Sequence, residues 1–368
     1  MFDRSAEPYS GRVSSHSTEV AVVGAGVSGL SAAYALRRRR VGCRVFEAGV
    51  PGSGQSAGRT RVFRHGHDDE RLTRLAIRAR EEWVRFEAEL GASLLGRQGV
   101  LICGPNVGER AAAFEAAGVP ARLLDRDEQV AALSVLSPPE DEALLDELGG
   151  AIDVRAVIDG LAGALADQLV TAEVFGLHER GGHVELQTSE GVWRAEQAIV
   201  CPGAGLHGLA AELDVDIPLT LDLHARAAFA VREPGGSLAC LQDRSGVHGE
   251  TVYAAPMPDG RHYAVGLGGE HEPPVDEAIA RLTAYVERAL PGLDPEPASV
   301  RLCRTSILPW GADAFATWRT GNVDVLAGAN LFKFGPLLGE LLADRSDELL
   351  PEAQLGRAPA GQASSPSS

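Results

Sequence analysis

Short apolar runs alternate with segments of helical periodicity from residue 19 onward. Glu19–Val23 has the length of a strand, Ser28–Arg39 has a helical period, and Cys43–Glu47 is a second apolar strand. Asp68–Leu90 is amphipathic at helical spacing and is followed by Gly91, which predicts a long helix that ends there. A strand–helix–strand unit at the start of the chain indicates an α/β fold with a parallel sheet.

The second half of the chain continues this alternation. We expect helices at Ile152–Leu169, Asp276–Leu290 and Pro336–Ala343. We expect a small antiparallel ribbon around Gly181-Gly182, several strands within 219–270 and a last strand at Val323–Ala327. A buried strand at Ala198–Cys201 runs directly into Pro202-Gly203. Small residues at the carboxyl end of a parallel strand let a ligand approach the sheet, so Gly203 is a candidate contact for a bound nucleotide.

Composition narrows the possible partners and the compartment. The 368 residues are 45% hydrophobic, which is enough for two domains with buried cores. A net charge of −17 disfavours nucleic acid and anionic lipid as partners. No apolar run approaches the roughly 20 residues that span a bilayer. Five widely spaced cysteines without a CxxC pattern indicate a reduced, cytoplasmic chain without disulfides or a metal site.

Both ends of the chain differ in composition from the rest. Residues 1–17 are polar and lack the apolar stretch of a signal peptide. The segment from Gln354 to the last residue is rich in Ala, Gly, Pro and Ser. We therefore expect disordered tails at 1–17 and 354–368.

The turn after the first strand matches the pattern GxGxxG. Gly24, Gly26 and Gly29 supply its glycines, and Glu47 ends the next strand. Gly24 permits the tight turn, Gly26 lets the backbone approach a pyrophosphate, and Gly29 allows the helix to pack closely on the strand. The helix N-terminus offers N–H groups to phosphates, and Glu47 can accept hydrogen bonds from ribose hydroxyls. This combination predicts a dinucleotide site but does not by itself separate FAD from NAD.

Several further segments carry a resemblance to a known family. Together with the glycine motif, Ser56–His65 resembles the FAD-dependent D-amino-acid-oxidase-like superfamily, and within it the branch of monomeric sarcosine oxidase and N-methyltryptophan oxidase. Tyr263–Gly266, Arg301–Arg304 and Leu331–Phe334 follow in the family's order and rough spacing. The resemblance favours FAD over a nicotinamide cofactor, because the family keeps its electron acceptor bound.

The resemblance also implies an architecture. Overall the fold would be α/β with α+β character, with a Rossmann-type FAD domain assembled from discontinuous segments and an antiparallel-sheet substrate domain. The FAD domain would comprise 18–70, 152–218 and 300–345. The substrate domain would comprise 71–151 and 219–299.

The activity and site residues that the resemblance implies are more specific. The family oxidises N-methyl or cyclic secondary amino acids, with hydride transfer to the flavin from the carbon beside nitrogen. Residues at the positions of Arg64 and Lys333 clamp the substrate carboxylate, and Cys303 aligns with the site of covalent flavin attachment. Arg61 and Phe332 lie in matching segments and are expected at the cofactor. The implied partner is a small amine that carries a carboxylate, bound by a monomer or a small homo-oligomer.

Physical chemistry bears differently on each of these residues. An arginine fork matches a carboxylate and a lysine adds a compact charge, although most arginines and lysines lie at the surface. Lys333 stands between Phe332 and Phe334, where a charge usually has an anionic partner. Two arginines flank Cys303, and cations make a nearby thiol more reactive. The alternative for Cys303 is a small buried hydrophobe.

The chain departs from the family's pattern at the amine end of the pocket. Ala264 stands where the family has a lysine that promotes reaction with oxygen, and the family's next histidine is lost unless His271 replaces it. Thr305 replaces a frequent tyrosine, and 328–330 is a shortened loop. Sarcosine as substrate and efficient use of oxygen are therefore in doubt. The alternatives to an amine oxidase are a dehydrogenase-type tailoring enzyme with poor oxygen reactivity and a non-catalytic flavin-binding subunit.

Overall fold

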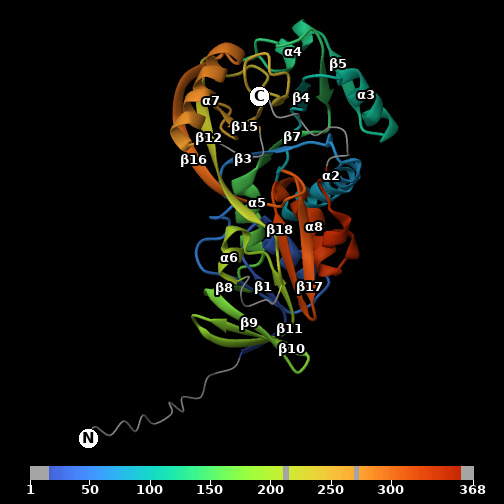
Figure 1. Cartoon of the computed structure of the whole chain (residues 1–368), viewed down its shortest axis with the longest axis vertical. Coiled ribbons are helices and arrows are strands. Elements are labelled where there is room, and N and C mark those ends of the chain that lie inside the picture. The colour runs from blue at the N-terminus through green and yellow to red at the C-terminus, as the bar shows by residue number, and fades with distance from the viewer. Residues whose placement is uncertain (1–15, 210–214, 269–272, 358–368) are drawn as a thin grey trace, which may run out of the picture.

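The computed structural model describes residues 16–209, 215–268 and 273–357. Two eight-stranded sheets organise these residues, one in the lower and one in the upper half of the molecule in Figure 1. Helices pack on the faces of both sheets, which confirms the predicted α/β class.

The first sheet is mainly parallel. Its strand order is β17-β18-β11-β1-β2-β8, and the hairpin of β9 and β10 extends it beyond β11. β1 pairs in parallel with β2 on one side and with β11 on the other, whereas β17 runs antiparallel to β18. The strands are β1 His16–Val23, β2 Cys43–Glu47, β8 Leu169–Thr171, β9 Val174–Arg180, β10 His183–Thr188, β11 Gly191–Val200, β17 Phe315–Thr320 and β18 Val323–Gly328.

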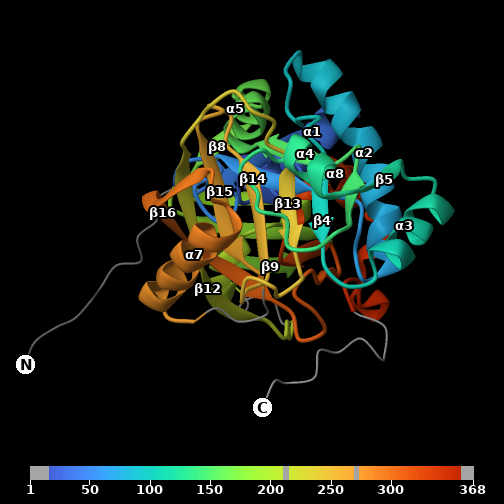
Figure 2. The same cartoon turned by 90° about the horizontal axis from the view of Figure 1, so that it is seen from above.

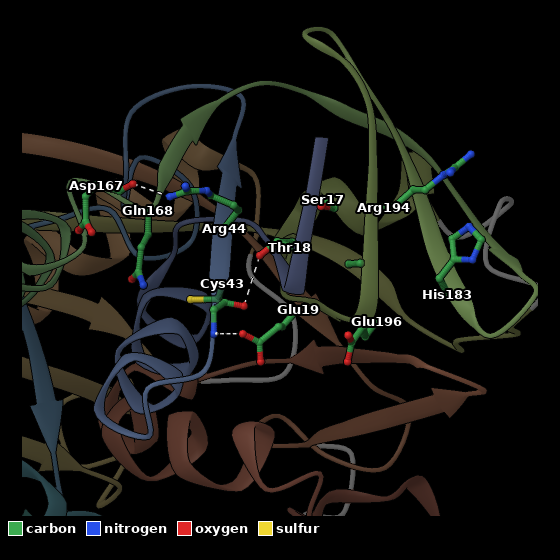
Figure 3. Close-up of a pocket in the computed structure, with 12 residues that line it drawn as sticks. Ser17, Thr18, Glu19, Cys43, Arg44, Asp167, Gln168, His183, Arg194 and Glu196 are labelled. Carbon is green, nitrogen blue, oxygen red and sulfur yellow. Dashed lines mark hydrogen bonds between the residues drawn. The ribbon is translucent and has the colours of Figure 1, made fainter. Parts of the chain in front are cut away.

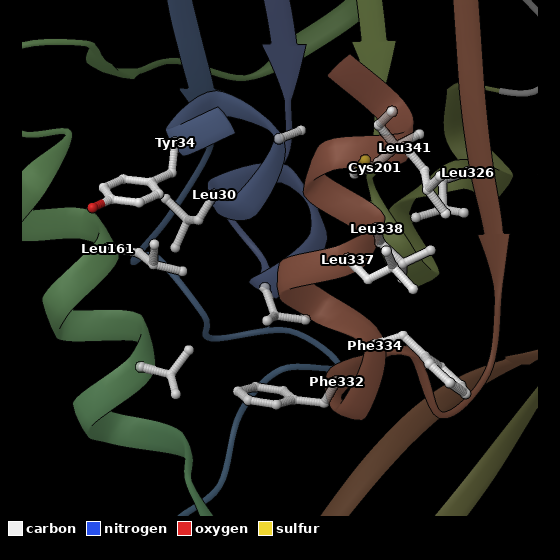
Figure 4. Packing of buried hydrophobic residues seen from close by; sticks show 14 of the residues in the cluster. Leu30, Tyr34, Leu161, Cys201, Leu326, Phe332, Phe334, Leu337, Leu338 and Leu341 are labelled. Atoms are coloured by element: carbon white, nitrogen blue, oxygen red, sulfur yellow. The ribbon is translucent and has the colours of Figure 1, made fainter. Parts of the chain in front are cut away.

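Four helices share one apolar cluster on a face of this sheet. They are α1 Val27–Arg38, α2 Glu70–Leu90, α5 Val154–Ala164 and α8 Gly335–Ala343. Figure 4 shows the part of this cluster formed by α1, α5 and α8. Residues of β1 alternate between the two faces: Val22 belongs to this cluster, and Val23 belongs to the cluster on the opposite face. α1 and α8 pack so closely that a Cβ on Gly339 would lie 2.4 Å from the carbonyl oxygen of Ser31.

The second sheet is antiparallel except for the parallel pair β13 and β4. Helix α7 (Val275–Ala289) packs on one of its faces (Figure 2), and its buried side chains join those of the strands in one cluster. Two shorter helices, α3 (Val107–Ala116) and α4 (Arg126–Ala132), lie beside β4 to β6. The strand order is β16-β12-β15-β14-β13-β4-β6-β5, with bounds β4 Val100–Cys103, β5 Ala121–Leu124, β6 Ala143–Asp146, β12 Thr220–Val231, β13 Cys240–Asp243, β14 Val252–Pro256, β15 His262–Leu267 and β16 Leu293–Ile307.

A two-stranded ribbon lies between the two sheets. β3 (Thr60–Phe63) pairs antiparallel with β7 (Gly150–Asp153). β3 packs against β14 of the second sheet and against the 3-10 turn η3 (Leu331–Phe334), which leads into α8. Residues from both halves of the molecule therefore meet around β3. The remaining elements are η1 Gly203–Gly205, α6 Leu206–Leu209, η4 Asp347–Leu349 and η5 Pro351–Ala353.

The structure corrects the predicted helix at Ile152–Leu169. The helix α5 ends at Ala164, and Leu169 already begins β8. Leu169 pairs with Val45 of β2, so hydrogen bonding to the parallel sheet overrides the helical period at this end of the segment.

Of the two expected tails, residues 1–15 and 358–368 lie outside the described residues, and the rest differs from the prediction. His16 and Ser17 belong to β1 and pair with β11. Leu355 is buried with 5% exposure, and its carbonyl oxygen accepts a hydrogen bond from Trp310 Nε1 at 3.1 Å. Residues 354–357 are thus held by packing, despite their small and polar composition.

Two of the expected domain boundaries also differ from the structure. The boundary at residue 300 falls inside β16, whose whole length pairs with β12 of the second sheet. Helix α2, expected in the substrate domain, packs with α1 and α8 on the first sheet. Among the described residues, no helix is both long enough and apolar enough to cross a membrane. All five cysteines are buried and free.

Candidate active site

The glycine motif lies at the carboxyl end of β1, where it turns into α1. Gly24 has φ +95°, and a Cβ there would lie 2.5 Å from the carbonyl oxygen of Cys201. A Cβ on Gly29 would lie 1.9 Å from the carbonyl oxygen of Gly24, so only glycine lets α1 pack this closely on its own turn. By contrast, a Cβ on Gly26 would meet only Ser56 Oγ, at 3.2 Å. Gly26 therefore presents open backbone, as the approach of a pyrophosphate requires.

The first turn of α1 is suited to an anion. It contains no acidic residue, and Gly26 at its N-cap position has no side chain to cap it. Ser56 Oγ accepts a hydrogen bond from the Val27 N–H at 2.9 Å, which ties the segment after β2 to the helix start. The helix dipole and the remaining N–H groups of the first turn, which have no partner within the helix, favour a phosphate at this position.

Glu47 stands at the end of β2, directly beside the glycine motif. Its Oε2 accepts a hydrogen bond from the Ala25 N–H at 2.8 Å, and its Oε1 accepts one from the Gly49 N–H at 3.0 Å. Gly203, with φ +56°, begins η1 after β11, and a Cβ there would lie 3.0 Å from Gln55 Oε1. Glycines, helix start and acid are thus gathered at the carboxyl edge of the parallel strands, and this donor set fits the adenosine and pyrophosphate half of FAD.

Arg61 of β3 is enclosed by the segment that precedes it. Its guanidinium donates to the carbonyl oxygens of Thr60 at 2.9 Å and Gln55 at 3.2 Å, and it lies 6.0 Å from the centre of the Phe332 ring. Burial lowers the pKa of Arg61 to about 9, and the positive charge of Arg226 contributes in the same direction. Arg61 and Phe332, both expected at the cofactor, therefore lie together.

The face of the second sheet opposite α7 contributes residues to the same region. Arg226 of β12 pairs in register with Gly266 of β15, and its Nε donates to Tyr253 OH on β14 at 2.8 Å. Ala264 lies two residues from Gly266 and so shares this face. Cys303 lies on it as well, because it is two residues from Arg301, the direct partner of Arg226 in β16. Sequence reasoning found Ala264 and Cys303 but missed Arg226, which comes from a neighbouring strand.

Arg64 and Lys333 are brought together by a third residue, Asp313. Arg64 Nη2 lies 2.7 Å from Asp313 Oδ2, and Lys333 Nζ lies 3.3 Å from Asp313 Oδ1. The side chains of the two cations are only 12% and 6% exposed. The expectation that Lys333 has an anionic partner is confirmed, with the chain's own carboxylate in that role.

Two uncharged groups complete the contacts of Asp313. His67 Nδ1 lies 3.0 Å from Oδ2, and Asn330 Nδ2 donates to Oδ1 at 2.7 Å. Burial acts to raise the pKa of Asp313, but Lys333, Arg64 and His67 together hold it well below its usual range. Burial, Arg64 and Lys333 hold the pKa of His67 well below its usual range. An ionised carboxylate only accepts hydrogen bonds, and Arg64 Nη1, 3.2 Å from Nδ1, can donate to the Gly66 carbonyl oxygen instead. We therefore assign the proton of neutral His67 to Nδ1, from which it is donated to Asp313; the approach of Arg64 Nη1 to Nδ1 is then not a hydrogen bond.

Lys333 titrates near neutral pH. Burial lowers its pKa to about 7, Asp313 raises it, and Arg64 and Arg244 lower it. Lys333 is also the only lysine in the sequence. A buried ammonium with a shifted pKa is typical of functional sites.

Asp313 and His67 were both missed from the sequence. His67 stands three residues after Arg64, and the only available signal was the pair of histidines in Arg64-His65-Gly66-His67. His65, the other one, is fully buried against Asp146 at 2.9 Å and serves the fold. Asp313 lies in the loop that connects β16 of the second sheet to β17 of the first, and no helical or strand period in the sequence points to it.

Two cavities differ in their relation to this site. One of about 330 Å³ is lined by Asp68, Arg110 and Arg244, among others, and is linked to the Asp313 cluster by charge interactions of Asp68 with Arg64 and of Arg244 with Lys333. The other, of about 700 Å³, is lined by residues such as Glu19, Arg44 and Asp167 at the amino ends of the parallel strands (Figure 3). Nucleotides bind at the carboxyl ends of such strands, so the larger cavity is remote from the site. His271 lies outside the described residues.

Comparison with known proteins places this geometry in a family. The chain is 27% identical to monomeric sarcosine oxidase of Arthrobacter sp., over 88% of this chain and 91% of that one, and 25% identical to peroxisomal sarcosine oxidase of Homo sapiens, over 91% and 93%. Among solved structures, NikD, an unusual amino acid oxidase essential for nikkomycin biosynthesis, has the same fold with a TM-score of 0.80 and 21% identity, over 94% of this chain and 98% of that one. Glycine oxidase from Geobacillus kaustophilus has a TM-score of 0.75 with 20% identity, over 93% and 98%. The family model for FAD dependent oxidoreductases matches residues 19–345, and the chain belongs to this family of FAD-binding enzymes.

Proposed function

We propose that this FAD-dependent oxidoreductase oxidises the carbon–nitrogen bond of a small amine that carries a carboxylate, such as an N-methyl, cyclic secondary or otherwise modified amino acid. The observation that carries the proposal is the convergence of Arg64 and Lys333 from distant parts of the chain in one nearly buried cluster. The names of the relatives, which are oxidases of sarcosine and of glycine, support the same substrate class.

The chain's residues would divide the work between cofactor and substrate. FAD, when bound, accepts a hydride equivalent from the carbon beside nitrogen. Gly24–Gly29 and Glu47 would hold its pyrophosphate and ribose, with Gly203, Arg61 and Phe332 along the rest of the cofactor. Arg64 and Lys333 would orient the substrate by its carboxylate, which leaves its amine end free to face the flavin.

Anaerobic mixing of the flavin-loaded protein with a panel of N-methyl, cyclic and primary amino acids tests the proposal. Bleaching of the flavin absorbance by at least one member is the expected result. An unchanged spectrum with every member would contradict it and favour a non-catalytic flavin-binding subunit. We also propose that the chain works in the cytoplasm, as a monomer or a small homo-oligomer.

Covalent attachment of the flavin through Cys303 is a separate part of the proposal. Cys303 is 8% exposed and shares its sheet face with Arg301 and Arg226, and its charge when ionised would interact favourably with Arg61. We expect flavin to stay with the protein after acid precipitation, and a Cys303→Ala variant to release all of it. Absorbance of the supernatant is the measurement, with Cys201→Ala as the matched control. Complete release of flavin from the unmodified protein would exclude covalent attachment and leave Cys303 as a buried packing residue.

The reaction of the reduced enzyme with oxygen depends on the cations near Ala264. A cation stabilises the negative charge that develops when oxygen accepts an electron. Ala264 offers none, and this motivates the alternative of a dehydrogenase with poor oxygen reactivity. Arg226 on the adjacent strand is the nearest cation on the same face that we identify.

We expect Ala264→Lys to raise the rate of reoxidation, and Arg226→Ala to lower it in the unmodified background. Stopped-flow recovery of the flavin absorbance after photoreduction and mixing with aerated buffer measures both rates. Arg232→Ala, a cation of the same strand region whose Nε donates to Leu293 O, is the control. If neither substitution changes the rate, then this face does not control the reaction with oxygen.

A further inference from the structure

We propose that Asp313 is an internal carboxylate that competes with the substrate's carboxylate for Arg64 and Lys333, and that it thereby sets the affinity and the pH dependence of anion binding. The inference rests on the proposed function, because it takes Arg64 and Lys333 as the groups that bind the substrate's carboxylate. It adds a specificity-determining residue to that site.

The contacts of Asp313 are those that a bound carboxylate would make. Each of its two oxygens has a cation and a neutral donor: Arg64 and His67 for Oδ2, and Lys333 and Asn330 for Oδ1. A carboxylate with four donors around its two oxygens is fully satisfied. The arrangement is therefore already an anion site, formed around a side chain of the chain itself.

Both cations retain donors that the described contacts do not use. Arg64 places Nη1 against the Gly66 carbonyl oxygen and His67, and Nη2 against Asp313. A guanidinium has five N–H donors and an ammonium three, whereas the ammonium of Lys333 makes one described hydrogen bond, to Asp313. These unused donors are the ones that would bind a substrate carboxylate, which would then share the two cations with Asp313.

The charge balance sets the cost of this sharing. With Lys333 protonated, Arg64, Lys333 and Asp313 sum to one positive charge, and His67 is neutral. With Lys333 deprotonated, they sum to zero. An incoming carboxylate also meets the like charge of Asp313 at close range in a nearly buried site, where Coulomb interactions are strong. Removing that charge should strengthen anion binding.

The pH dependence follows from the surroundings of Lys333. The charged or titratable groups described around its ammonium are Asp313, Arg64, His67 and Arg244, and the Phe334 ring lies 5.3 Å from Nζ. Because the pKa of Lys333 is lowered to about 7, its positive charge is present below pH 7 and is lost as the pH rises through that value. Asp313 raises this pKa, so without its charge the ammonium would be lost at a lower pH.

Titration of the flavin-loaded protein with acetate, followed by flavin absorbance from about pH 5.5 to pH 8.5, tests the proposal. Acetamide serves as the uncharged analogue. At pH 5.5, where Lys333 is most fully protonated, we expect Asp313→Asn to bind acetate about tenfold or more tightly than the unmodified protein, while acetamide binding stays the same. We expect its acetate affinity to begin to fall at a lower pH. Lys333→Arg, which keeps its charge, should remove the pH dependence around pH 7.

Asp68→Asn is the matched control. This variant also loses one negative charge near the site, but the described ion pairs of Asp68 are with Arg244 and Arg110. The acetate affinity of Asp68→Asn should stay within about threefold of that of the unmodified protein. Weaker or unchanged acetate binding by Asp313→Asn at pH 5.5 would overturn the competition. An unaltered pH profile in Lys333→Arg would overturn the pH dependence, and this result does not depend on whether the Asp313 variant folds.

Arg64→Ala separates failure of this inference from failure of the proposed function. If Arg64→Ala weakens acetate binding and Asp313→Asn does not tighten it, then only the competition is wrong. If Arg64→Ala leaves acetate binding unchanged, then the carboxylate site itself is misplaced.

Discussion

An Arg64→Ala variant should bind carboxylate inhibitors about thirtyfold to several thousandfold more weakly than the unmodified protein, with its flavin content unchanged. Truncating one partner of a buried, hydrogen-bonded charge pair costs about 2–5 kcal/mol, which is that range of affinity. The structure adds a reason for a large effect. Without Arg64, the charges of Asp313 and Lys333 cancel, and the site offers a carboxylate no net attraction.

Spectral titration with a simple carboxylate measures this effect. Lys333→Ala should behave similarly, because it leaves Arg64 paired with Asp313. Arg155→Ala is the matched control, since Arg155 is 64% exposed on α5 and pairs with Asp159 on the same helix. Equal affinity in the Arg64 variant and the unmodified protein would show that Arg64 does not bind the carboxylate.

A Gly26→Leu variant should lose most of its FAD while it remains folded. Gly26 has extended backbone with φ −76°, a conformation that any residue can adopt, so the substitution does not strain the backbone. A Cβ there meets only Ser56 Oγ, and the rest of a leucine would extend over the start of α1, where the pyrophosphate binds. Overpacking of this kind costs about 1–3 kcal/mol, or roughly five- to 150-fold in affinity.

The ratio of flavin to protein absorbance measures the loss. Gly108→Leu is the control, because Gly108 in α3 also has open space around its Cβ position. Full flavin content in the Gly26 variant, with far-ultraviolet circular dichroism unchanged, would show that the pyrophosphate lies elsewhere.

The nucleotide half of the site could be predicted from sequence because its determinants are local. Gly24, Gly26 and Gly29 lie in one turn, and the strand that precedes them and the helix that follows have clear periods. Even Glu47 is only one strand away. The structure places all of these together at the carboxyl edge of β1 and β2.

The substrate half could be predicted only in part. Family resemblance indicated Arg64 and Lys333, but neither periodicity nor spacing marks Asp313, which contacts Arg64 across 249 positions of the sequence. Arg226 was missed for a similar reason, since its position opposite Gly266, on the same sheet face as Ala264, depends on the register of β12 with β15. Such contacts form only when segments that are distant in the sequence pair, so the local pattern of hydrophobic and polar residues does not predict them.

Comparison of an amino acid with its own amide shows whether Arg64 and Lys333 select the substrate by its carboxylate. The measurement is the rate of anaerobic flavin bleaching by a substrate from the panel and by its carboxamide, which keeps the same oxidisable carbon–nitrogen bond. We expect fast bleaching by the acid and bleaching slower by about thirtyfold or more by the amide, because the amide lacks the charge that Arg64 and Lys333 recognise. Equal rates for acid and amide would show that the cluster around Asp313 plays no part in selecting the substrate.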